Sequence, residues 1–265
     1  MEIVTPRTNP APVRAVLLDF DGTLSTIRCG WEDVMRPLML EMLSPGGQDA
    51  SVAEAVDRYI DQSTGIQTIH QMKWLAARAH RANPAAPDDP WWYKDEYNRR
   101  LMRVVEERVQ ALLSKRAPRD SYLIAGSEDF LRALKDRGVA LYVASGTDDP
   151  DVRREVAALG LTDYFTRVSG APVREESCSK EQVIDALIRG AGLSGADFAV
   201  VGDGKVEIAL GRAAGARTLG LATDEHARSG INPVKRARLL QAGADAIAGD
   251  FLDLRAILGF LGLEV

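Results

Sequence analysis

Two aspartates that stand one residue apart are the part of the sequence best suited to chemistry. Asp19 and Asp21 follow the apolar run 15–18, and Gly22 comes next. Parallel α/β sheets bind ligands at the carboxyl ends of their strands, so acids at the end of a buried strand indicate a binding site. Crowded carboxylates repel one another and attract a hard cation such as Mg²⁺. The pattern indicates phosphoryl transfer, although a simple Asp-Gly turn has the same residues.

Two places further along the chain carry groups that bind anions. Ser145 and Gly146 follow the apolar run 139–144 and offer a hydroxyl and exposed backbone N–H groups. Lys180 lies in the first turn of the predicted helix 180–190, where the helix dipole disfavours a cation. A phosphate or a buried carboxylate would explain that lysine. The simpler interpretations are a strand-to-helix turn for Ser145 and Gly146 and a solvated side chain for Lys180.

A third acidic position supplies a further carboxylate ligand for a metal site. The predicted strand 198–202 ends in Gly202, and Asp203 and Gly204 follow. Asp203 can join the pair formed by Asp19 and Asp21, and Glu207 at the start of the next helix can reach a metal directly or through a water. Taken alone, Asp203 is also a plausible turn residue.

The four places together, in this order, resemble the haloacid dehalogenase superfamily of aspartate-nucleophile phosphohydrolases, of the phosphoglycolate phosphatase-like kind with a helical cap. The residues that match are the segment 19–23, Ser145, Lys180 and the pair at 202–203. They cover the predicted core, roughly residues 11–25 and 122–250. Glu207 stands where the family more often has aspartate, so the charge is kept and one methylene is added.

The resemblance implies a role for each matching residue. Asp19 would be the nucleophile that forms an aspartyl phosphate, and Asp21 would be the general acid and base. Ser145, the Gly146 amide and Lys180 would hold the phosphoryl oxygens. Mg²⁺ would be the cofactor, and its ligands would come from the acidic set Asp19, Asp21, Asp203 and Glu207, with Asp21 acting through its backbone carbonyl.

The organisation of the chain fits an α/β fold with an insertion. Helical periodicity dominates between the first strand and residue 122, whereas strands and helices alternate afterwards. We expect a Rossmann-like, doubly wound parallel sheet, with residues 1–25 and 122–265 as the catalytic core. Residues 26–121 would form an inserted all-helical domain, which the resemblance identifies as a cap. Its predicted helices lie near 31–43, 52–60, 67–80 and 91–115.

The cap would set the substrate specificity, because it would contact the group that is attached to the phosphoryl group. Arg28 lies just beyond the first acidic pair and can grip a second anionic group, or it can be a surface arginine. Gln67 and Gln71 can hydrogen-bond sugar hydroxyls. The alternative, which we favour slightly, is that Thr64 caps the helix and that both glutamines are solvated.

The composition of the chain limits the classes of molecule that it is expected to bind. The chain has 265 residues, a net charge of −5 and 46% hydrophobic residues, which favours a globular protein with no broad attraction for nucleic acid or anionic membranes. Two cysteines, Cys29 and Cys178, do not make a disulfide framework. With no apolar signal core and no long apolar segment, we expect a cytoplasmic protein, monomer or homodimer, whose partner is a small phosphorylated metabolite.

The leading hypothesis from the sequence is a Mg²⁺-dependent phosphatase of a sugar phosphate or a phosphoglycolate-like acid. A phosphosugar mutase of the same fold is the alternative among enzymes, because the aspartyl phosphate can pass to another hydroxyl instead of water. A catalytically idle binding or regulatory protein that keeps the fold is the alternative outside the enzymes.

Overall fold

The computed structural model describes residues 1–6, 11–47, 49–176, 179–190 and 192–263. Cys29 is a free thiol, and Cys178 lies outside the described residues. Within the described ranges, no helix has the length and apolar character needed to cross a membrane.

A seven-stranded sheet forms the centre of the fold, in the order β1-β7-β6-β5-β2-β3-β4. The strands are β1 Glu2–Ile3, β2 Ala15–Leu18, β3 Ala140–Asp148, β4 Arg167–Ala171, β5 Phe198–Gly202, β6 Arg217–Leu221 and β7 Ala246–Ala248. β2 lies between β5 and β3 and is parallel to both. The strand order reverses around β2, so a ligand site is expected at its carboxyl end. The predicted doubly wound α/β class is confirmed.

The edge strand β1 departs from the predicted parallel sheet. Glu2 pairs with Ile247 and Ile3 with Ala246, so β1 runs antiparallel to β7. A strand of two residues is too short to show alternation in the sequence, and its partner strand lies near the other end of the chain.

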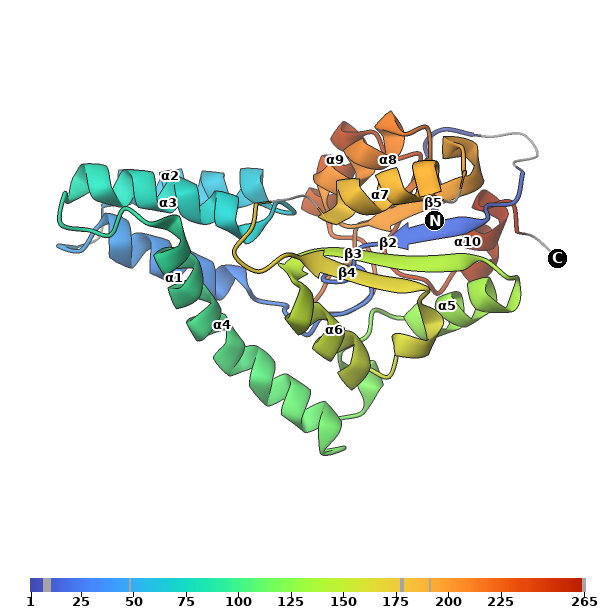
Figure 1. The fold of residues 1–265 in the computed structure, drawn as a ribbon, viewed down its shortest axis with the longest axis horizontal. Helices are drawn as coiled ribbons and strands as arrows, with labels where there is room; N and C mark the ends of the chain where they lie inside the picture. The colour runs from blue at the N-terminus through green and yellow to red at the C-terminus, as the bar shows by residue number, and fades with distance from the viewer. Residues whose placement is uncertain (7–10, 48, 177–178, 191, 264–265) are drawn as a thin grey trace.

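Helices cover both faces of the sheet. They are α5 Ser127–Asp136, α6 Asp149–Ala158, α7 Ser179–Gly190, α8 Lys205–Ala213, α9 Pro233–Ala242 and α10 Leu254–Phe260. Short 3₁₀ turns lie at Arg119–Ser121, Thr162–Tyr164 and Gly195–Asp197. Figure 1 shows α7, α8 and α9 on one face and α5 and α6 on the other. Helix α10 was not predicted from the sequence, because its seven residues are too few to show a helical period.

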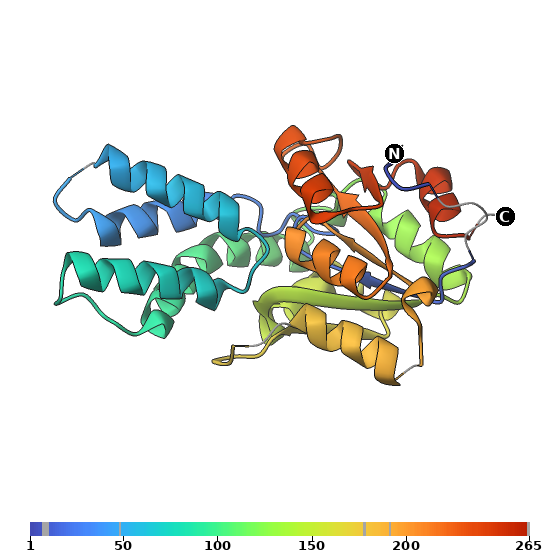
Figure 2. The same ribbon diagram turned by 90° about the horizontal axis from the view of Figure 1, so that it is seen from above.

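Four helices form the insertion between β2 and α5. They are α1 Glu32–Leu43, α2 Ala50–Ser63, α3 Thr68–Ala82 and α4 Pro90–Leu113. All four were predicted, and their amphipathic faces pack on one another. Figure 2 shows them to one side of the sheet, at the end opposite to both chain termini. In Figure 1, β2 points toward this helical insertion, so its carboxyl end lies where the insertion meets the sheet.

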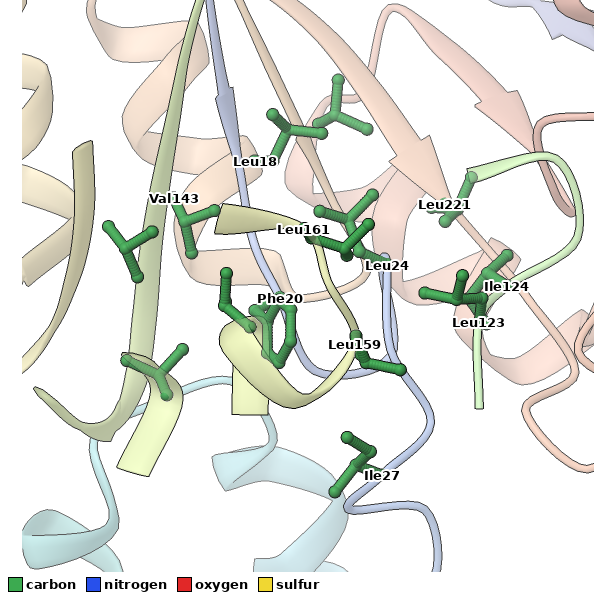
Figure 3. Packing of buried hydrophobic residues seen from close by; sticks show 14 of the residues in the cluster. Leu18, Phe20, Leu24, Ile27, Leu123, Ile124, Val143, Leu159, Leu161 and Leu221 are labelled. Carbon is green, nitrogen blue, oxygen red and sulfur yellow. The ribbon is translucent and has the colours of Figure 1, made fainter. Parts of the chain in front are cut away.

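Buried apolar side chains fix the loop that follows β2. Figure 3 shows Phe20 among Val143, Leu159 and Leu161, and Phe20 is fully buried. The Phe20 carbonyl accepts hydrogen bonds from the backbone N–H groups of Leu24 and Ser25. The loop is therefore a rigid turn that holds the acids on either side of Phe20 in fixed positions.

Candidate active site

Asp19 lies directly after β2, and a buried lysine neutralises it. The backbone N–H of Asp19 donates to the Val201 carbonyl at 2.9 Å, which continues the pairing with β5. Lys180 Nζ lies 3.1 Å from Asp19 Oδ2 and 2.7 Å from Glu207 Oε2. Burial raises the pKa of Asp19, and the charge of Lys180 opposes that rise. The unusual lysine of the first helical turn thus contacts buried carboxylates, one of the two partners expected from the sequence.

Glu207 folds back over two glycines to reach Lys180. Its Oε1 accepts a hydrogen bond from the Gly204 N–H at 2.6 Å. A Cβ at Gly202 would lie 2.4 Å from Glu207 Oε1, so only glycine leaves room for this side chain. The glycines on either side of Asp203 therefore accommodate the extra methylene of the glutamate.

The acidic set is suited to a divalent cation. Carboxylate oxygens of Asp19, Asp203 and Glu207 lie within 4.8 Å of one another, and all three residues are buried. Within the described part of the chain, the buried Oδ1 of Asp21 has no hydrogen-bond partner. Buried carboxylates are costly unless cations or hydrogen bonds compensate them, and hard cations prefer oxygen ligands. The residues present therefore fit Mg²⁺ or a similar ion.

Asp21 is held by two hydroxyls of β3. Thr147 Oγ1 donates to Asp21 Oδ2 at 2.9 Å, and Ser145 Oγ lies 3.4 Å from the same oxygen. Burial raises the pKa of Asp21, whereas Arg28 and these hydrogen bonds lower it. β3 was predicted to end before Ser145, but it continues to Asp148. Thr147 was missed in the sequence, because its role depends on this extension.

The first acidic loop is locked to the loop after β5. Gly22 has a φ of +72°, and a Cβ there would lie 2.4 Å from Asp203 Oδ2. Thr23 Oγ1 accepts a hydrogen bond from the Asp203 N–H at 3.1 Å. The two loops can approach this closely only with glycine at position 22.

Lys235 and Glu225 join the site from the polar stretch after β6. Lys235 Nζ lies 2.7 Å from Asp203 Oδ2 and 2.5 Å from Glu225 Oε1. Neither residue was given a role from the sequence. The sequence did carry a signal for them, because a lysine and an acid follow a strand whose carboxyl end lies at the same edge of the sheet as Asp19.

Arg28 is buried beside the acids and not on the surface, so the surface alternative is wrong. Its Nη2 lies 2.6 Å from Glu155 Oε1 and 3.6 Å from Asp151, and its Nε lies 4.0 Å from Asp21. Although burial lowers the pKa of Arg28, the charges of Glu155 and Asp21 raise it above its ordinary value. The guanidinium is therefore a permanent charge with carboxylate partners inside the protein.

The helical insertion and the sheet together line one pocket of about 130 Å³ at this place. Asp19, Asp21, Ser145, Gly146 and Lys180 line it from the sheet side. Arg28 comes from the loop that leads into α1, and Gln71, Lys94 and Asn98 come from α3 and α4. The size suits a small molecule, and the lining brings together most of the residues singled out in the sequence.

The expectation of a helix cap at Thr64 and of solvated glutamines is wrong. Thr64 is the C-cap of α2, and its hydroxyl donates to the Ile60 carbonyl. Gln67 and Gln71 are both buried. Gln71 Nε2 donates to Ser63 Oγ at 3.1 Å and lines the pocket. Gln67 Nε2 donates to the Glu175 carbonyl at 2.9 Å and ties α3 to the loop after β4.

Polar contacts near the tip of α2 and along α3 join the helical insertion to the sheet side, and we call them the seam. They comprise Lys205 to the Gln62 carbonyl, Arg238 to Asp61, Lys73 to Glu176, and Gln67 to the Glu175 carbonyl. A Cβ at Gly65 would lie 3.4 Å from Gly204 Cα, so the two backbones approach closely there. Of the ion-paired side chains, all but Arg238 are well exposed.

The comparison with known protein families gives one match that spans most of the chain. Residues 13–215 match the family described as haloacid dehalogenase-like hydrolase. This range begins just before β2 and contains all four of the sequence segments that carry the acids, Ser145 and Lys180.

Individual relatives are more distant. The chain is 25% identical to a phosphoglycolate phosphatase of Rhodospirillum rubrum, over 93% of this chain and 91% of that protein. The structure of a predicted phosphoglycolate phosphatase from Haemophilus somnus has a TM-score of 0.63 at 18% identity, covering 95% of this chain and 99% of that one. A β-phosphoglucomutase structure from Clostridium difficile has a TM-score of 0.64 at 12% identity, covering 94% and 97%. At these identities, the structural likeness establishes the fold alone.

Proposed function

The chain belongs to the haloacid dehalogenase-like hydrolases, and from that premise we propose that it is a Mg²⁺-dependent phosphatase of a small phosphorylated metabolite. The observation that carries the proposal is the arrangement of Asp19 and Asp21. Asp19 contacts the buried Lys180, Asp21 accepts a hydrogen bond from the Thr147 hydroxyl, and these side chains line the same pocket. The names of the relatives suggest a phosphoglycolate-like acid or a sugar phosphate as substrate.

The proposed reaction has two displacements at phosphorus. A carboxylate oxygen of Asp19 attacks the phosphorus, and the bond to the leaving alkoxide breaks while Asp21 gives that oxygen its proton. Asp21 then accepts a proton from water, whose oxygen attacks the aspartyl phosphate and releases inorganic phosphate. A raised pKa suits Asp21 to both steps, because it must hold a proton in the first and accept one in the second.

The phosphoryl oxygens would be held by Ser145, the Gly146 N–H and Lys180, which line the pocket beside Asp19. Lys180 also reduces the repulsion between Asp19 and the incoming dianion. Among the acids, Asp19, Asp203 and the Asp21 carbonyl would hold Mg²⁺, and Glu207 would complete the acidic set. When bound, the ion would stabilise the negative charge on the phosphoryl group during its transfer.

The helical insertion would act as a cap over this site. In this proposal residues 26–121 form the cap, and residues 1–25 and 122–265 form the catalytic core. The shared lining of the pocket supports the division, since the core offers the reactive groups and the insertion offers Gln71, Lys94 and Asn98.

Phosphate release from a panel of phosphorylated sugars, acids and nucleotides, with and without Mg²⁺, tests the proposal. We expect Mg²⁺-dependent release that disappears in Asp19→Asn and persists in Asp136→Asn, a change at an exposed helix end far from the pocket. Release that persists in Asp19→Asn would overturn the proposal. No release without a sugar bisphosphate activator would indicate a mutase, and no Mg²⁺ binding at all would indicate an idle binding protein.

A further inference from the structure

We propose that the pocket selects a phosphate ester whose other end is a neutral, polyhydroxylated group, such as a sugar or polyol, and rejects one that carries a second anion. The inference rests on the proposed function and narrows its substrate class. It concerns the leaving-group side of the pocket, by which we mean Arg28, Gln71, Lys94, Asn98, Asp148 and Asp151.

The cation that the helical insertion contributes from α4 is already neutralised. Lys94 is only 4% exposed, and its Nζ lies 2.5 Å from Asp148 Oδ1. Asn98 Nδ2 donates to the other oxygen of Asp148 at 3.3 Å. The carboxylate of Asp148 therefore occupies the place beside Lys94 that a substrate carboxylate would need.

The second cation, Arg28, is committed in the same way. Glu155 is 1% exposed and accepts from both Nε and Nη2 of Arg28. Asp151, which lines the pocket, lies 3.6 Å from Arg28 Nη2. A guanidinium already held by a buried carboxylate in this geometry has little left to offer a further anion.

No net positive charge is left on this side of the pocket. Its two cations, Arg28 and Lys94, are matched by the carboxylates of Asp148 and Asp151, and Arg28 is also held by Glu155, which lies behind it outside the lining. A carboxylate or a second phosphate on the substrate would be brought next to acids of like charge in a largely buried pocket, which is strongly unfavourable.

The groups that remain for a ligand are mainly acceptors. Gln71 Nε2 donates to Ser63, and Asn98 Nδ2 donates to Asp148, so the oxygen of each amide is left as an acceptor, and Asn98 keeps one N–H as a donor. The carboxylate of Asp151 is a further acceptor on the opposite wall, with 31% of its side chain exposed. Acceptors spread over both walls suit a ligand with several hydroxyl donors better than a single point charge.

The test compares kcat/KM of the Mg²⁺-loaded protein for D-glucose 6-phosphate, D-ribose 5-phosphate and glycerol 3-phosphate with that for 2-phosphoglycolate, which carries a second anion. We expect a preference of at least about tenfold for the best hydroxylated ester, the size of effect that like-charge contacts readily give. Asp148→Asn frees Lys94, and Asp151→Asn removes a carboxylate from the pocket wall, so we expect each change to shift the ratio toward 2-phosphoglycolate by about tenfold. Asp149→Asn, on the same turn of α6 but outside the pocket lining, should leave the ratio unchanged.

The outcomes separate the two proposals. If the wild-type protein releases no phosphate from these esters or from p-nitrophenyl phosphate, the proposed function is wrong. If it hydrolyses esters but prefers 2-phosphoglycolate, the function stands and the substrate inference is overturned. The substrate inference is also overturned if both asparagine variants keep the wild-type ratio.

Discussion

Lys180 and Glu207 form a buried ion pair of 2.7 Å, and the same ammonium lies 3.1 Å from Asp19. One lysine thus contacts two carboxylates, one directly after β2 and one in the first turn of α8. Breaking a buried pair by removing one partner is far more costly than the pair's net contribution, because the remaining charge stays buried.

We expect Lys180→Met to lower the free energy of unfolding by about 3 kcal/mol, since Asp19 and Glu207 would lose their shared cation. Phosphate release should fall about 100-fold or more. Urea unfolding and the phosphate assay measure the two effects. Lys180→Arg keeps the charge and should recover part of the stability, and equal instability of both variants would contradict the electrostatic explanation.

The contact between Gly202 and Glu207 predicts a coupled pair of substitutions. Gly202→Ala places a methyl group against Glu207 Oε1, so we expect a loss of about 2 kcal/mol in stability. In a Glu207→Ala background the obstruction is gone, and the cost of Gly202→Ala should fall by about 1 kcal/mol or more. Denaturant unfolding of the wild type, the two single variants and the double variant measures this coupling. If Gly202→Ala costs the same stability with and without Glu207, the glycine is not needed to make room for that side chain.

A surface group in the helical insertion predicts a pH dependence of stability. The hydrogen bond from Arg99 lowers the pKa of Glu96 to about 2, burial opposes this, and Arg100 lowers it further. Because the folded pKa lies below the ordinary value of 4.5, the stability that Glu96 provides is present above pH 4.5 and is lost as the pH falls toward 2. Partial exposure to solvent reduces its size to about 1 kcal/mol.

We therefore expect Glu96→Gln to destabilise the protein by about 1 kcal/mol at about pH 6 and by progressively less at about pH 4 and about pH 3. Urea unfolding at the three pH values measures the difference. Glu54→Gln, which breaks a fully exposed pair with Arg58, is the matched control and should show little effect. A Glu96→Gln cost that grows as the pH falls would contradict the direction of the pKa change.

The elements with strong local signals were predictable from the sequence. Runs such as 198–202 and the helix at 233–242 were predicted with the bounds that the structure has, because apolar runs and helical periods are local properties. The residues Asp19, Asp203 and Lys180 were predicted to gather for the same reason, since each stands next to such an element.

The partners of those residues could not be predicted, because they depend on tertiary contacts. Glu155 looks like any acid on an amphipathic helix until α6 brings it to Arg28, 127 residues away in sequence. Gln71 resembles a solvated glutamine until α2 covers it with Ser63. Lys235 acquires a role only when α9 packs beside β6.

The two edges of the helical insertion are attached to the sheet by different forces. At the seam, Lys73 and Asp61 pair with their partners in contact with water, and such pairs contribute about 0–1 kcal/mol each. At the other edge, Ile27 and Leu101 belong to one apolar cluster with the sheet, and Arg108 binds the Ile27 carbonyl. Dissolved ions screen the exposed pairs of the seam, whereas the apolar cluster around Ile27 and Leu101 is not weakened by screening. Raising the ionic strength is therefore expected to loosen the contact of α2 and α3 with the sheet side before the packing of Ile27 and Leu101 against it.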